Sequence, residues 1–101
     1  MSKFIRHKKK DRNHKELVEY FRANGATVDD VSALPDIGYD IIVCYRGVVV
    51  FTEIKDGEKP PSARKLTESE EAAALRHGEK FAVVETIEQA RGLLDSIREH
   101  T

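Results

Sequence analysis

The segment from residue 38 to residue 55, GYDIIVCYRGVVVFTEIK, constrains the fold of this chain more than any other. It has two runs rich in β-branched residues on either side of Arg46-Gly47, a pair suited to a two-residue hairpin turn. If this pair forms the turn, counting outward along both strands places Asp40 opposite Glu53. Because side chains alternate along a strand, Lys55 shares the face of Glu53. The hairpin is therefore predicted to bring two carboxylates and one ammonium together at its open end.

Both faces of this hairpin are otherwise apolar, so we expect other parts of the chain to pack against both faces, or against one face while a dimer partner packs against the other. Apolar periodicity and stop signals predict elements around it. Thr67 with Glu70, and Thr86 with Gln89, have the spacing of capping boxes at two helix starts. The expected elements are a helix over about 11–24, a strand or loop near 26–28, a turn near 35–36, helices over 67–77 and from 86, and a strand over 81–84. The predicted fold class is α/β, in the order α-β-β-β-α-β-α with a small mixed sheet.

Charge is distributed unevenly along the 101 residues. Residues 1–15 hold seven Lys or Arg against one acid, so the rest of the chain is acidic, since the net charge is −1. We expect residues 1–10 to form a basic, mobile arm and residues 11–101 to form one domain. A basic arm favours a polyanionic partner, most often nucleic acid, and the alternative is a solvated terminus. The residues expected to bind nucleic acid in this region are Lys8, Lys9, Lys10 and Arg12.

The chain has no long apolar run and no signal-peptide pattern, so we expect no membrane partner. Cys44 is its one cysteine, which excludes an internal disulfide and favours a reducing cytoplasm.

The charged end of the hairpin has the composition of a small metal site. Mg²⁺ prefers oxygen ligands and keeps several waters, so Asp40 and Glu53 suffice if a substrate phosphate completes its shell. Lys55 could orient a water or neutralise charge on a phosphoryl group. The alternative is a surface ion pair at the end of a sheet, which contributes only ~0–1 kcal/mol.

Asp40 followed by Glu53-Ile54-Lys55 resembles the PD-(D/E)XK nuclease superfamily, with its restriction-endonuclease-like and Holliday-junction-resolvase-like folds. The resemblance covers most of the chain and is greatest to small phage and prophage nucleases near the VRR-NUC branch. The ordered motifs that carry it are Asn13-His14-Lys15-Glu16, Gly38-Tyr39-Asp40, Glu53-Ile54-Lys55-Asp56-Gly57 and 61–67, PSARKLT. It implies a restriction-endonuclease-like core, DNA cleavage with Mg²⁺ (or Mn²⁺ as a substitute), a phage or prophage origin, and a bacterial or phage-infected cytoplasm.

Two positions depart from the superfamily pattern. Tyr39 stands where a proline should precede the metal-binding aspartate, and the literal Pro35-Asp36 would overshoot Glu53 by about 13 Å at ~3.3 Å per residue. We therefore assign Asp40 to the site and Pro35-Asp36 to a turn. Glu70 stands where the family often has a helix glutamine near the lysine, and we favour a capping role for it over a site role.

The resemblance also implies a helix carboxylate in the metal site, and Glu16 matches it. By helical angle Glu16 lies beside the apolar stripe, whereas Glu19 points nearly opposite, and a solvent-exposed Glu16 is the alternative. His14, Lys59, Arg64 and Lys65 are further candidate DNA contacts, with solvated loop positions as the alternative for the last three.

Two hypotheses follow. The first is a metal-dependent DNA endonuclease in which Asp40, Glu53 and Glu16 bind metal and Lys55 positions the attacking water. A domain this small has little room for base reading, so we expect structure-selective cleavage of branched or junction DNA by a homodimer. The second is a catalytically inactive nucleic-acid-binding module that keeps the fold. The facing carboxylates argue against the second, because they would repel each other without a cation.

Overall fold

The computed structural model describes residues 10–101, and the predicted arm lies almost entirely outside them, with Lys10 as its described member. The element order is α-β-β-β-α-β-α, as predicted, with two short 3₁₀ turns around the second helix. The helices and strands are α1 (His14–Ala23), β1 (Thr27–Asp30), β2 (Ile41–Tyr45), β3 (Val48–Ile54), α2 (Glu68–His77), β4 (Phe81–Val84) and α3 (Ile87–Glu99). The 3₁₀ turns are η2 (Pro61–Arg64) and η3 (Gly78–Lys80).

The four strands form one mixed sheet in the order β1-β2-β3-β4. β1 to β3 are antiparallel, and β4 pairs with β3 in parallel. The predicted hairpin register is confirmed, since Tyr45 pairs with Val48 and Ile41 with Thr52. Arg46 and Gly47 both have positive φ angles, 51° and 81°, which is the geometry of a type I′ turn.

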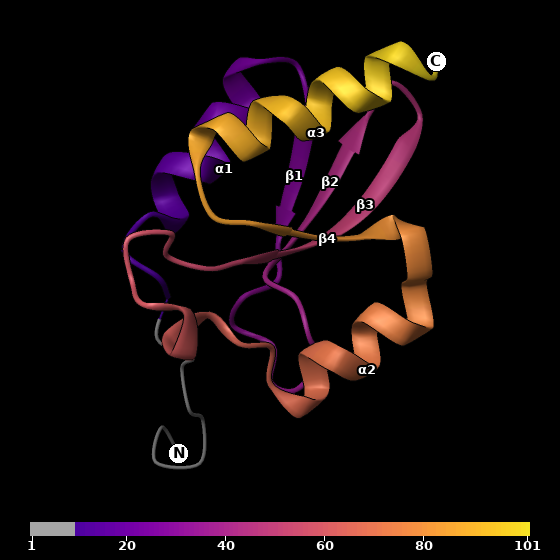
Figure 1. Ribbon diagram of the computed structural model, residues 1–101. Helices are drawn as coiled ribbons and strands as arrows, with labels where there is room; N and C mark the ends of the chain where they lie inside the picture. The colour runs from indigo at the N-terminus through magenta and orange to yellow at the C-terminus, as the bar shows by residue number, and fades with distance from the viewer. Residues whose placement is uncertain (1–9) are drawn as a thin grey trace.

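Helices cover both faces of the sheet, as the two-sided apolar hairpin required (Figure 1). α1 and α3 lie on one face, where Leu17, Phe21 and Leu94 pack with Ile41 and Ile54 in the main core. α2 lies on the other face, in orange in Figure 1. Among residues 10–101, no helix is long and apolar enough to cross a membrane.

The structure differs from the predicted elements at three points. α1 begins at His14 rather than Asp11, and β1 runs on to Asp30. The capping box of Thr67 and Glu70 is present in full, but the second box is only half formed. Thr86 accepts the N–H of Gln89, whereas the Gln89 side chain accepts the N–H of Glu85, one residue before the cap.

Candidate active site at the end of the hairpin

Asp40 lies where β2 begins, and it leaves the regular ladder there. Its backbone N–H donates to the carbonyl of Thr52 at 3.0 Å, while its Oδ2 accepts the backbone N–H of Ile54 at 3.0 Å. A side-chain oxygen thus replaces the next backbone acceptor of the hairpin. This corrects the predicted pairing of Asp40 directly opposite Glu53. Asp40 instead bonds to Thr52 and Ile54, the residues on either side of Glu53. Asp40 is 5% exposed.

Glu53 and Lys55 lie on the α2 side of the sheet, at the end of β3. The Nζ atom of Lys55 is 3.5 Å from Oε2 of Glu53, so the predicted shared face is confirmed. Both residues are buried, with 1% of Glu53 and 8% of Lys55 exposed. The surface ion pair that was the alternative interpretation does not describe this site, because burial removes most of the solvent screening that weakens surface pairs.

Glu70 connects α2 to this site. Its Oε1 is 2.8 Å from Nζ of Lys55 and 2.9 Å from the backbone N of Thr67, so it caps α2 and pairs with the lysine at once. Burial favours the neutral form of Glu70, but the hydrogen bonds from Lys55 and Thr67 outweigh it and lower its pKa. Burial likewise opposes the charge of Lys55, and its two carboxylate partners outweigh it and raise its pKa. The sequence analysis favoured a capping role for Glu70 over a site role, and the structure shows that Glu70 both caps α2 and contacts Lys55.

Gly38 and Tyr39 bring the start of β2 against α2. Gly38 has φ +94°, and a Cβ there would lie 2.3 Å from the carbonyl oxygen of Ser69, so only glycine allows this approach. Tyr39, at the position of the expected proline, packs against Phe51 and His77 with ring centroids 5.1 Å and 5.6 Å away. Tyr39 therefore has a packing role between the sheet and α2.

A hollow of about 230 Å³ opens between these elements. Tyr39 and Glu70 line it together with Asp36 and Ser69, which come from the turn before β2 and the first turn of α2. Glu70, which is 2% exposed, is thus the member of the buried group that lines this hollow. Asp36, the alternative aspartate, has φ 59° and belongs to the turn, as predicted from its position.

Glu16 lies apart from the other predicted carboxylates. It is exposed on α1 and lines a different hollow with Asn13 and Thr86. Within residues 10–101, no three or more His, Cys, Asp or Glu side chains gather closely enough to hold a metal ion. The structure therefore does not assemble the expected set of Glu16, Asp40 and Glu53. Asp40 and Glu53 offer carboxylate oxygens, the type of ligand that a hard cation such as Mg²⁺ takes together with waters and phosphate oxygens.

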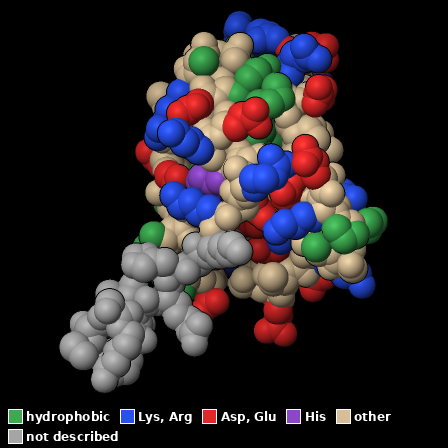
Figure 2. Space-filling view, turned by 90° about the vertical axis from the view of Figure 1, so that its left-hand side faces the viewer, with side chains coloured by type: hydrophobic (Ala, Val, Ile, Leu, Met, Phe, Trp, Pro, Cys, Tyr) green, Lys and Arg blue, Asp and Glu red, His purple; other side chains and the backbone are tan. Residues whose placement is uncertain are grey.

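The predicted DNA-contacting residues occupy several surfaces, and Lys8 and Lys9 lie outside the described residues. Arg12 is engaged by Asp56 and Glu58, at 3.0 Å and 3.2 Å. Lys59 lies 3.7 Å from Asp11. Figure 2 shows basic and acidic side chains interspersed on the face that carries α1 and the loop after β3. Among the described residues visible in this view, no large patch has a single sign.

Arg64 and Lys65 lie in the loop that follows β3. Arg64 donates to the carbonyl of Lys59 and to Glu85, so it fastens the loop to the end of β4. Lys65 is exposed. Of the two, Lys65 has the freer geometry for a phosphate contact.

Asn13 was missed as a positioning residue. Its Nδ2 donates to the backbone carbonyls of Lys55 and Glu85, at 3.1 Å and 2.9 Å, and so ties the start of α1 to the ends of β3 and β4. The sequence placed it inside the predicted helix, as the first residue of the motif Asn13-His14-Lys15-Glu16, and gave it no role of its own; in the structure it directly precedes α1, and its side chain makes no capping bond. Asp56, bonded to Arg12 through both oxygens, adds a second tie between the same segments.

Comparisons of the chain with protein-family models, with curated proteins and with solved structures found no match.

Proposed function

We propose that this protein is a divalent-metal-dependent endonuclease that hydrolyses phosphodiester bonds in DNA. The observation that carries the proposal is the buried group at the end of β3, in which Lys55 lies 3.5 Å from Glu53 and 2.8 Å from Glu70. Asp40 adds a second carboxylate from the neighbouring strand. A fold gains little stability from burying so many charges together, so a chemical role explains them better.

Each residue has a role that its contacts suggest. Asp40 and Glu53 would hold Mg²⁺ or Mn²⁺, which supplies an activated water and stabilises charge on the phosphoryl group. Lys55 would place a positive charge beside the attacking water. Glu70 would hold the Lys55 ammonium charged and in one orientation, while the bond from Ile54 holds Asp40. The resemblance to PD-(D/E)XK nucleases supports the same roles for Asp40, Glu53 and Lys55.

The substrate is best sought among branched DNAs. Residues 10–101 form a four-stranded sheet and three helices with no separate element for reading bases, so contacts to the backbone fit the described part of the chain better than sequence recognition. A junction has two-fold character, and a homodimer would present two sites to it. A restriction-endonuclease-like core and a phage or prophage origin belong to this proposal.

A second function, a nucleic-acid-binding module without catalysis, is favoured by one observation. Asp40, Glu53 and Lys55 are each 8% exposed or less, and Lys55 already has two carboxylate partners. Such a group could serve the fold as a satisfied internal ion cluster.

One assay separates the two functions. Purified protein is incubated with a four-way DNA junction and with a linear duplex of the same arms, in Mg²⁺, in Mn²⁺ and in EDTA. Cleavage that needs a metal and favours the junction supports the proposal. Salt-dependent binding of both DNAs with no cleavage in either metal supports the binding module.

A further inference from the structure

Lys55 and Glu85 are the first residues beyond the last pair of the parallel β3–β4 ladder, Ile54 with Val84. The N–H of Lys55 still donates to the carbonyl of Val84, at 3.1 Å, and the two chains part after this bond. The side-chain amide of Asn13 bridges them there, because its Nδ2 donates to the carbonyls of Lys55 and Glu85, at 3.1 Å and 2.9 Å. One side chain from the segment before α1 therefore holds the ends of both strands.

The amide of Asn13 has one favourable orientation. Its NH₂ group has two hydrogens, and the two carbonyls use both, whereas the reverse orientation would place Oδ1 against two carbonyl oxygens. Asn13 is 6% exposed, and its Oδ1 is buried without a hydrogen-bond partner among residues 10–101. An asparagine before a helix often accepts a backbone N–H of the first turn, and Asn13 makes no such bond. The residue thus forgoes helix capping while it holds Lys55 and Glu85.

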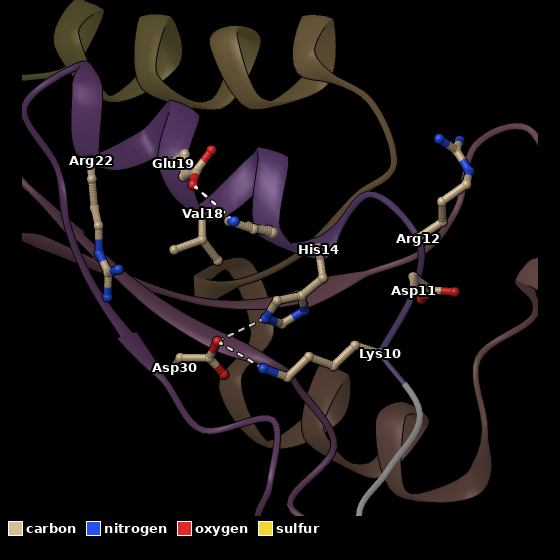
Figure 3. A pocket seen from close by; sticks show the side chains of 9 residues that line it. Lys10, Asp11, Arg12, His14, Val18, Glu19, Arg22 and Asp30 are labelled. Carbon is tan, nitrogen blue, oxygen red and sulfur yellow. Dashed lines mark hydrogen bonds and ion pairs between the residues drawn. The ribbon is translucent and has the colours of Figure 1, made fainter.

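The start of α1 is itself anchored, on its other side, to β1. Nε2 of His14 lies 2.8 Å from Oδ2 of Asp30, and His14 is 4% exposed. Figure 3 shows the ring extending from the start of α1 toward Asp30. The other oxygen of Asp30 accepts the N–H and the hydroxyl of Ser32, at 3.0 Å and 2.6 Å. Asn13 therefore extends from a segment that the next residue holds against the sheet, and such support is what a positioning residue needs.

Lys55 is held at both ends of its side chain. Arg12, directly before Asn13, donates to both carboxylate oxygens of Asp56, at 3.1 Å and 3.0 Å, so two consecutive residues before α1 hold two consecutive residues after β3. At the far end, Nζ of Lys55 lies 2.8 Å from Oε1 of Glu70. The main chain of Lys55 is thus fixed by Asn13 and its ammonium by Glu70.

We propose that Asn13 is a positioning residue for the cleavage reaction, a role that rests on the proposed function. By holding the carbonyl of Lys55, it sets where the Lys55 ammonium lies beside the attacking water. Asn13 is buried and has no contact with substrate or metal in this role. A misplacement of about 1 Å at a group that acts on the transition state costs about 100-fold in rate. Loss of the amide should therefore lower kcat and leave the binding of DNA nearly unchanged.

The first test compares junction cleavage by Asn13→Ala with that of two controls, all as folded proteins in saturating Mg²⁺. Val28→Ala lowers stability from the core side of β1, two strands away from β3, and Asn24→Ala removes an exposed amide at the other end of α1. Asn13→Ala should lose at least about tenfold in kcat and change KM by less than about threefold, whereas both controls should match the wild type. If Asn13→Ala does not fold, Asn13→Ser replaces it, because its shorter side chain has one donor for two carbonyls.

A second readout does not depend on cleavage. In the full chain labelled with ¹⁵N on its lysine side chains, without metal or DNA, the Nζ signal of Lys55 is identified by NMR through its loss in Lys55→Gln. Asn13→Ala should shift or broaden this signal, because the lysine would no longer be fixed at its main chain. Val28→Ala should leave the signal unchanged.

The outcomes separate the role of Asn13 from the nuclease function. Wild-type kcat in Asn13→Ala, an equal loss of kcat in Val28→Ala, or a rise in KM alone would overturn the role of Asn13 while the nuclease stands. An Nζ signal that Asn13→Ala leaves unchanged overturns it at any rate of cleavage. If the wild type cuts no DNA, the nuclease fails, and an Nζ signal that changes in Asn13→Ala but not in Val28→Ala still supports the positioning of Lys55 by Asn13.

Discussion

Oε1 of Glu70 accepts hydrogen bonds from two groups at once, Nζ of Lys55 at 2.8 Å and the backbone N–H of Thr67 at 2.9 Å. One carboxylate therefore starts α2 and orients the lysine of the candidate active site. This relationship links the start of α2 to the charged group that contains Lys55.

Replacing Glu70 should separate these two effects. Glu70→Gln keeps an oxygen that can accept the N–H of Thr67, and it should lower the unfolding free energy by about 1 kcal/mol. Glu70→Ala removes the cap and leaves Lys55 less well paired, and it should lower the unfolding free energy by about 3 kcal/mol. Urea denaturation followed by circular dichroism measures both. Equal stability of the two variants would contradict the double role.

Gly38→Ala should destabilise the protein by about 2 kcal/mol or more. The residue has φ +94°, and its new Cβ would meet the carbonyl of Ser69. Gly92→Ala is the matched control, because Gly92 lies inside α3 with open space around its Cβ position, and it should stabilise by roughly 0.5–1 kcal/mol. Thermal unfolding of the pair checks the sign of each change. A neutral Gly38→Ala would mean that α2 does not pack this closely.

The His14–Asp30 pair predicts a pH dependence of stability. The pKa of Asp30 is lowered in the folded protein, so its contribution is present above the unfolded value of ~4 and is lost as the pH falls below it. Asp30→Asn should therefore cost about 1–2 kcal/mol at pH 7 and less at pH 3. Denaturant titrations at the two pH values measure the difference. A cost that does not shrink in acid would count against an ionised Asp30.

Deleting residues 1–10 should weaken DNA binding and flatten its salt dependence, because the deletion removes five Lys or Arg from a segment with no acid. Fluorescence anisotropy at several salt concentrations gives both quantities. A variant in which an uncharged segment of equal length replaces residues 1–10 controls for chain length. Unchanged affinity would remove this segment from the DNA-binding account.

The elements that could be predicted from the sequence are those governed by local chemistry. Arg46-Gly47 specified the turn, and the turn specified the register that brought Glu53 and Lys55 to one face. Asp40 departs from that register because its carboxylate, rather than a backbone carbonyl, accepts the N–H of Ile54. No local sequence pattern predicts which of these two acceptors is used.

The contacts that escaped prediction join distant segments. Asn13 bonds to Lys55 and Glu85, and His14 bonds to Asp30 across the α1–β1 turn. Glu16 was placed at the site by the family resemblance and by its helical angle, and a helical angle gives the direction of a side chain but not where the helix sits on the sheet. Capping chemistry identified Glu70, and only the packing of α2 showed that the same oxygen also meets Lys55.

The most direct test of the central claim is the rate of junction cleavage by Lys55→Ala in saturating Mg²⁺ and saturating DNA, beside Lys80→Ala and the wild type. We expect Lys55→Ala to lose at least about 100-fold in rate, as removal of a transition-state charge does in other enzymes, while it still binds the junction. Lys80→Ala should cleave like the wild type. Cleavage by folded Lys55→Ala at the wild-type rate, or no metal-dependent cleavage by the wild type, would contradict the claim that this buried group is an active site.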